Sequence, residues 1–427
     1  MIPQTFINPE RDQWAEIIQR PAVNNEELAG IVTDILKDVK QNGEAAIKKY
    51  CLQFDKVQLD DLKVNELEIV EAVSMVDDEL KNAVQIAKAN IEKFHLSQKE
   101  EIKKIETSEG VSCWRKAVAI EKVGLYIPGG TAPLFSTLLM LGIPAVMAGC
   151  KEIIVCTPSD IDGKINPAIL YVAHLIGIKN IYKIGGVQAI GAMAYGSESV
   201  LKVYKIFGPG NQYVTAAKQI VNSEGIAIDM PAGPSEVAVY ADETCDPCFV
   251  ASDLLSQAEH GIDSQVLLVA TSERIVADVK KEIELQIELL SRKTIAGKAL
   301  SNSRFIVMQN VDEAFELLND YAPEHLIIAA DNAEGLSAKV INAGSVFLGH
   351  YSPESAGDYA SGTNHTLPTN GFAKAYSGVS LDSFIKKITF QKLSKEGLQN
   401  ISKAVEVMAA AEGLDAHKNA VTLRLKN

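Results

Sequence analysis

Histidines and carboxylates that could bind a metal or move protons recur in the second half of this 427-residue chain. Of the seven histidines, four lie in polar segments that contain glycine or proline, close behind an acid or an amide. The segments are Gln257-Ala-Glu-His260-Gly, Pro323-Glu-His325, Asp358-Tyr-Ala-Ser-Gly-Thr-Asn-His365 and Glu412-Gly-Leu-Asp415-Ala-His417. Zinc sites and proton-transfer sites both need histidine and carboxylate side chains. The pattern therefore predicts a metalloenzyme.

Each segment also has a purely structural interpretation. Gln257 and His260 are three residues apart near the end of a predicted helix and share one face, but His260 could equally cap that helix. Asp358 could be a turn aspartate in a loop of small residues. Glu324 and His325 join a predicted helix to a predicted strand, where Glu324 could activate water and His325 could move protons. Alternatively, His325 could stabilise the end of the helix, so spacing alone leaves both interpretations open.

Composition narrows the class of protein. The formal charge of -14 argues against nucleic-acid binding, which needs a concentrated basic surface. The 47% hydrophobic and 22% charged residues are typical of a soluble globular protein. The first residues lack the basic and apolar regions of a secretion signal, and six cysteines are too sparse for a disulfide scaffold. We therefore expect a cytoplasmic enzyme that binds neither nucleic acid nor membrane.

The hydrophobic pattern predicts an α/β fold with two or more domains. Residues 26–49 and 67–91 have helical spacing, and we expect residues 1–120 to form a mainly helical segment that packs on the second α/β block. Short apolar strands then alternate with helices, which predicts two incomplete doubly wound, Rossmann-like parallel sheets over 121–235 and 236–375. They would meet near Pro231-Ala-Gly-Pro234. Residues 376–427 are expected to form a helical tail.

Two further features are ambiguous by themselves. The turns at Gly129-Gly130, Gly185-Gly186 and Gly208-Pro-Gly210-Asn211 each lie between a predicted strand and a helix, whose N-terminus favours phosphate, but none has a complete dinucleotide fingerprint. Cys245-Asp-Pro-Cys248 could be a redox pair. Its Asp246 and Pro247 also suit the cap and first residue of a helix, which is the interpretation we favour.

Longer runs of residues resemble the histidinol dehydrogenase family, from about residue 25 to the end of the chain. The densest runs begin at Val123 (VGLYIPGG), Lys205 (KIFGPGN), Ile228 (IDMPAGPSE), Asp253 (DLLSQAEH), Ser345 (SVFLG), Ser352 (SPESAGDYASGTNH) and His417 (HKNAV). Runs of this length are more specific than any spacing pattern.

The resemblance implies an intertwined homodimer that oxidises L-histidinol through L-histidinal to L-histidine with two NAD. It implies Glu324 and His325 as catalytic residues. It also implies one zinc ion per subunit, and we expect it to be held by Gln257, His260, Asp358 and the other subunit's His417. The implied NAD contacts are Tyr126, Gln188 and Asn211. The implied substrate contacts are Ser235, Gln257, His260, His325, Asp358, His365, Glu412 and His417, with His365 and Glu412 also expected to cross the dimer.

Two rival functions use the same residues. A zinc hydrolase could combine the histidine and carboxylate cluster with water and no nicotinamide cofactor. A non-catalytic nucleotide-binding protein could keep the two sheets and lose the chemistry. The presence of both Glu324 and His325 disfavours the non-catalytic protein. A requirement for NAD would distinguish the dehydrogenase from the zinc hydrolase.

Overall fold

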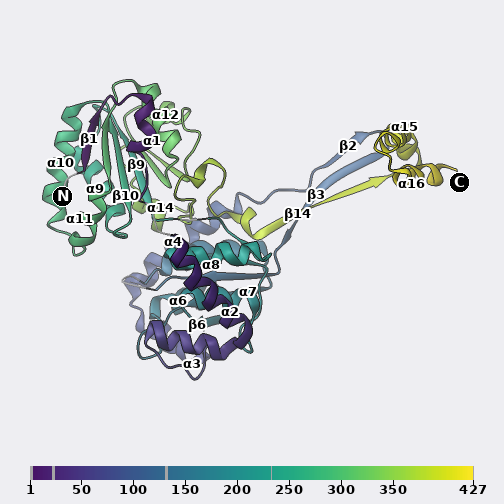
Figure 1. Ribbon diagram of the computed structural model, residues 1–427, viewed down its shortest axis with the longest axis horizontal. Helices are drawn as coiled ribbons and strands as arrows, with labels where there is room; N and C mark the ends of the chain where they lie inside the picture. Colours follow the sequence, from purple (N-terminus) through teal and green to yellow (C-terminus); the bar gives the residue numbers. More distant parts are fainter. Residues whose placement is uncertain (1–2, 22–24, 130–132, 232, 427) are drawn as a thin grey trace.

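The computed structural model describes residues 3–21, 25–129, 133–231 and 233–426. Figure 1 shows two α/β bodies and an extended arm that carries the C-terminus. The arm consists of β2 (Lys104–Ser108), β3 (Val111–Ala119), β14 (Ile385–Leu393), α15 (Lys395–Ala411) and α16 (Asp415–Leu425).

The first sheet is parallel and has the strand order β6-β5-β4-β7-β8. Its strands are β4 (Lys122–Tyr126), β5 (Glu152–Thr157), β6 (Asn180–Lys183), β7 (Lys205–Phe207) and β8 (Ala227–Ile228). The connecting helices are α5 (Phe135–Ala148), α6 (Pro167–Leu175), α7 (Gly186–Tyr195) and α8 (Gln212–Ser223). Separate apolar clusters cover the two faces, which explains why the central residues of these strands form continuous apolar runs rather than alternating with polar ones.

The second sheet is also parallel and has the order β1-β11-β10-β9-β12-β13. Its strands are β1 (Gln4–Ile7), β9 (Glu236–Ala241), β10 (Gln265–Ala270), β11 (Arg304–Val307), β12 (His325–Ala329) and β13 (Ser345–Leu348). Its helices are α9 (Pro247–Ala258), α10 (Glu273–Ile287), α11 (Lys293–Ser301), α12 (Val311–Tyr321) and α13 (Ala333–Ser337). Apart from the added edge strand β1, the order follows that of the first sheet, and apolar clusters again cover both faces.

The N-terminal segment packs differently from our expectation. Its helices α2 (Asn25–Tyr50), α3 (Glu66–Met75) and α4 (Asp78–Leu96) pack mainly on α5 to α8 of the first block. Helix α4 also reaches the second block, where Asn90 Nδ2 donates to the Ala360 oxygen at 2.8 Å. Strand β1 and helix α1 (Trp14–Ile17), with the short turn η1 (Arg11–Gln13), join the second block. The helical pattern identifies an apolar face such as that of Val32 and Val39, but it does not identify the surface that the face covers.

The arm was not predicted. In it β3 pairs antiparallel with both β2 and β14, within stretches that we had expected to be helical. Strands β2 and β14 are mostly exposed and mix charged residues with apolar ones, so they lack the apolar alternation that marks a half-buried strand. The helical tail was predicted correctly for α15 and α16 only.

Several local features complete the frame. Two 3-10 turns, η3 (Phe372–Lys374) and η4 (Leu381–Phe384), come before β14, and η4 leads directly into it. The π-turn η2 (Cys51–Asp55) follows α2. The segment between β8 and β9 links the two sheets, as expected, although Ala232 lies outside the described residues. Gly130 of the first glycine turn lies outside them as well. Among the residues described, no helix has the length and apolar content needed to cross a bilayer.

Candidate active site

Most of the candidate residues meet at one edge of the second sheet, where its parallel strands begin. His325 is the first residue of β12, and it pairs with Val237 near the start of β9. Helix α9 follows β9 and runs back towards this edge, so its end brings Gln257 and His260 there. Asp358 lies in the short helix α14 (Glu354–Tyr359) rather than in the irregular turn that small residues had suggested.

His325 lies at the centre of this cluster. Its Nδ1 is 3.5 Å from Glu354 Oε1 and 3.8 Å from Glu324 Oε2, and its Nε2 is 3.6 Å from Asp358 Oδ1. Nδ1 is also 3.4 Å from the backbone oxygen of Glu236. Burial lowers the pKa of this imidazole, but the three carboxylates outweigh burial and raise the pKa to about 10. A bound cation would oppose these carboxylates and lower the pKa of the imidazole again.

Glu324 is held by backbone geometry. The backbone N–H of Glu236 donates to Glu324 Oε2 at 3.0 Å. Glu236 is itself fixed by Arg20, whose Nη2 donates to Glu236 Oε1 at 2.8 Å and to the Tyr321 carbonyl at 2.6 Å. Burial raises the pKa of Glu324 to about 8, because a buried site disfavours the charged carboxylate.

The same cluster offers ligands for a metal ion. Ligand atoms of His260, Glu354 and Asp358 all lie within 4.8 Å of one another. The amide oxygen and nitrogen of Gln257 are buried and have no hydrogen-bond partner among the described residues, a state that a bound ion would relieve. Nitrogen and oxygen donors in this arrangement fit zinc, although an amide oxygen is an uncommon ligand.

His365 joins this cluster within one chain, so our expectation that it would cross the dimer was wrong. Its Nδ1 lies 2.9 Å from the backbone oxygen of Asp358, and its Nε2 lies 3.2 Å from Thr137 Oγ1 of α5. Burial lowers the pKa of His365, which favours the neutral ring. Ser235 immediately precedes β9 and so lies at the same sheet edge.

The two candidate residues nearest the C-terminus lie away from this cluster. Glu412 follows α15 and His417 lies in α16, and both are exposed. Figure 1 shows these helices at the far end of the arm, opposite the body that contains the second sheet. A single chain therefore does not bring Glu412 or His417 to the cluster.

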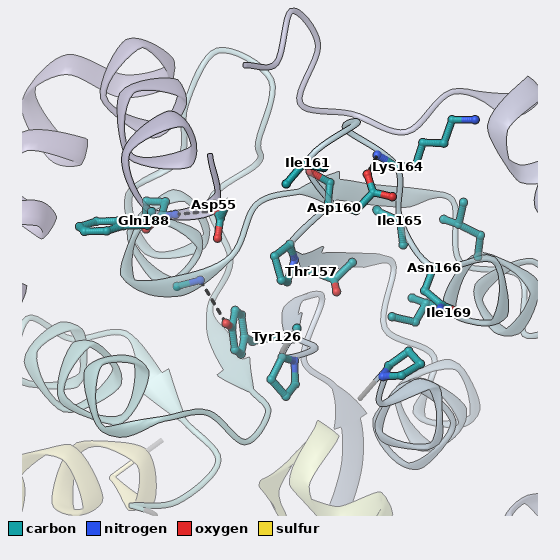
Figure 2. A pocket seen from close by; sticks show the side chains of 18 of the residues that line it. Asp55, Tyr126, Thr157, Asp160, Ile161, Lys164, Ile165, Asn166, Ile169 and Gln188 are labelled. Carbon is teal, nitrogen blue, oxygen red and sulfur yellow. Dashed lines mark hydrogen bonds between the residues drawn. The ribbon is translucent and has the colours of Figure 1, made fainter. Parts of the chain in front are cut away.

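A cavity of about 1000 Å³ lies at the carboxyl end of the first sheet, between β4, β5, α3 and the start of α7. Tyr126, Gln188 and Asn211 all line it, and Figure 2 shows Tyr126 and Gln188 together with Asp55. The Gly186 N–H donates to the Tyr126 hydroxyl at 3.1 Å, and Gln188 Nε2 donates to Asp55 at 3.4 Å. The other amide atom, Gln188 Oε1, is buried without a partner among the described residues. The cavity thus has room and polar groups for a large cofactor.

The turn that bears Asn211 is fixed by a buried ion pair. Lys218 and Asp229 form an ion pair, and both of them bind the backbone of Gly208. Lys218 Nζ donates to the Gly208 oxygen, and the Gly208 N–H donates to Asp229, each at 2.8 Å. Asn211 then caps α8 through the Tyr213 and Val214 N–H groups at 3.1 Å. The turn therefore places the helix start beside the cavity.

Sequence reasoning missed Glu354, whose only signal is its position four residues before Asp358, and Thr137, which has no sequence signal. The cysteine pair behaves as a helix start, since Asp246 caps α9 at the Cys248 N–H and Pro247 is the first helical residue. Burial raises the pKa of Cys245 to about 11, which disfavours a reactive thiolate.

Known proteins match nearly the whole chain. A family model for histidinol dehydrogenase matches residues 18–425. The histidinol dehydrogenase of Bacteroides thetaiotaomicron is 61% identical over 417 residues, covering 98% of this chain and 97% of the relative. That of Campylobacter jejuni strain RM1221 is 51% identical over 425 residues, covering 99% and 98%. The crystal structure of histidinol dehydrogenase from Elizabethkingia anophelis has a TM-score of 0.97 at 60% identity, covering 99% and 98%. The chain belongs to the histidinol dehydrogenase family.

Proposed function

We propose that this protein oxidises L-histidinol through L-histidinal to L-histidine, with zinc bound and with two NAD consumed. The observation that carries the proposal is the buried pair Glu324 and His325 beside the ligand atoms of His260 and Asp358. A base, a water-activating acid and a metal site within one cluster are the groups that an alcohol and an aldehyde oxidation need. The family membership supports the same reaction.

The residues of the two sites fit zinc and NAD. Gln257, His260 and Asp358 would hold zinc, with His417 from the partner, and zinc would orient the imidazole and amino groups of the substrate. Tyr126, Gln188 and Asn211 would contact NAD, which would accept one hydride in each oxidation. The unpartnered amides of Gln257 and Gln188 support these assignments, because buried polar atoms normally have partners.

His325 serves both oxidations as the base. In the first, its Nε2, which has no hydrogen-bond partner among the described residues, takes the hydroxyl proton while the carbon loses a hydride. The product is the aldehyde, and the imidazolium keeps the proton. After hydration, the same nitrogen takes a proton from the gem-diol as the second hydride leaves.

Glu324 serves the hydration between the two oxidations. It takes a proton from water while the water oxygen bonds to the aldehyde carbon, and the imidazolium of His325 returns a proton to the carbonyl oxygen. Its position against the Glu236 N–H fixes one carboxyl oxygen and leaves the other for water. Holding the aldehyde through these steps requires that bulk water is excluded.

The active enzyme is proposed to be an intertwined dimer of two doubly wound units per chain, in which each arm completes the partner's site. Exposed apolar residues on the arm support burial against a second copy; these include Phe390 (38% exposed), Val407 (52%), Met408 (64%) and Leu423 (60%). His417 and Glu412 would thereby reach a metal and substrate site that their own chain does not bring to them.

Two variants separate the steps. Glu324→Gln should still release one NADH per L-histidinol and accumulate the aldehyde, which semicarbazide would trap, whereas His325→Gln should release almost none. Equal loss of both oxidations in a folded, zinc-loaded Glu324→Gln enzyme would contradict the assigned roles. A zinc hydrolase would instead show turnover with no NAD requirement.

Mixed dimers test the shared site. A His417→Ala subunit paired with a Glu324→Gln, His325→Gln subunit should recover activity, because one site then combines the intact base and acid with the partner's intact histidine. No recovery in verified mixed dimers would show that each chain completes its own site.

A further inference from the structure

Glu354 is a buried carboxylate that the steps above do not use. It follows Pro353 at the start of α14 and is 1% exposed. Neither of its carboxyl oxygens has a hydrogen-bond partner among the residues that the structure describes. Burying a carboxylate without partners is costly, so such a group usually has a function that the local fold does not explain.

This carboxylate forms an ion-pair contact with the catalytic histidine. Glu354 Oε1 lies 3.5 Å from His325 Nδ1, while Asp358 Oδ1 lies 3.6 Å from His325 Nε2. Glu354 and Asp358 are four residues apart, so they project from the same face of α14. One helix face thus presents a carboxylate to each nitrogen of a single imidazole ring.

We propose that Glu354 is a positioning residue for His325. It holds the proton on Nδ1, so that Nε2 keeps the lone pair that accepts the substrate proton. It also stabilises the imidazolium that forms when that proton arrives, as the carboxylate of a catalytic triad does. The inference rests on the proposed function, because it concerns the base of that reaction.

Other groups near Nδ1 do not replace Glu354 in this role. Glu324 Oε2 is farther away, at 3.8 Å, and is already bound to the Glu236 N–H. The Glu236 carbonyl, at 3.4 Å, shares the Nδ1 proton and supports the same tautomer, but it carries no full charge to stabilise an imidazolium. Glu354 therefore supplies the negative charge that stabilises the imidazolium, which the backbone carbonyl cannot supply.

A competing role is metal ligation, because ligand atoms of Glu354, His260 and Asp358 lie within 4.8 Å of one another. The two roles predict different losses. A ligand that is removed lowers the metal content, whereas a residue that acts on the base lowers the rate and leaves the metal in place.

The test replaces Glu354 with glutamine, which keeps its size and removes its charge, in the full-length zinc-loaded protein. Glu354→Gln should lower kcat for NADH release roughly 100-fold, the lower end of what acid–base assistance contributes. KM for L-histidinol, its binding by calorimetry without NAD, and zinc content should stay within about twofold of wild type. Glu334→Gln, an exposed change in the same block, is the control and should alter none of these.

The conservative variant Glu354→Asp keeps the charge one methylene farther from His325, so it should lose less of kcat than Glu354→Gln. It also serves if the glutamine variant does not fold. Unchanged kcat would overturn the proposal, and so would zinc loss or a rise in KM that accounts for the whole defect. A wild-type protein that releases no NADH from L-histidinol would instead reject the proposed function itself.

Discussion

Replacing Lys218 by methionine should weaken both the fold and cofactor binding. Lys218 and Asp229 are 5% and 1% exposed and form a buried ion pair. Removing one partner of such a pair typically costs about 3–5 kcal/mol, because the other charge stays buried. Asp229 would keep its two backbone hydrogen bonds, from Gly208 and Met230 at 2.8 Å each, so we expect about 3 kcal/mol.

The double variant Lys218→Met, Asp229→Asn removes both charges and should cost less than the sum of the single changes. Urea unfolding followed by circular dichroism would measure the loss, with the slope checked against wild type. KM for NAD should rise in Lys218→Met more than kcat falls, because Lys218 fixes the Gly208 carbonyl and hence the turn that bears Asn211. A cost below about 1 kcal/mol with unchanged KM for NAD would refute this reasoning.

Two further changes probe the same cavity. Gly208→Ala should lower stability by at least about 1 kcal/mol and weaken NAD binding, because Gly208 has a φ of +125° and a Cβ there would lie 2.1 Å from the Tyr126 backbone oxygen. The control is Gly297→Ala in α11, where a Cβ meets nothing within 4 Å, and it should not destabilise the protein. Equal melting temperatures of the two variants would contradict this. Burial raises the pKa of Asp55 from 3.8 to about 6. The wild type should therefore lose stability relative to Asp55→Asn as pH rises from about 4 to about 6, because the buried carboxyl group must then ionise. A constant difference in melting temperature over that range would contradict the raised pKa.

The alternation of strands and helices could be predicted from the sequence because both sheets are buried on both faces. Strands such as β10 (QVLLVA) are then continuous apolar runs after the first residue, and the helices between them are amphipathic. The exposed strands of the arm offered no such signal: β14 (IKKITFQKL) mixes lysines with apolar residues because it packs on little of its own chain. The packing partner of α2 also could not be predicted, since periodicity defines a face and not its target.

The site was only partly predictable. Glu324 and His325 stood out because an acid and a base adjoin at the start of a strand, and the structure brings Asp358 and His260 to the same edge. The role of Gln257 as a metal ligand came only from the family resemblance, because a neutral amide oxygen is an uncommon zinc ligand. Glu354 was missed because a glutamate after a proline is common at the start of a helix, and the sequence does not show that this one is buried.

The most direct test of the account is the amount of NADH released from limiting L-histidinol, with zinc bound and after chelation. Two NADH per substrate, lost on chelation and restored by zinc, would agree with a metal-dependent four-electron oxidation. One NADH per substrate would contradict the role of Glu324 in hydrating the aldehyde. No NADH from a folded, zinc-loaded protein would contradict the proposed function as a whole.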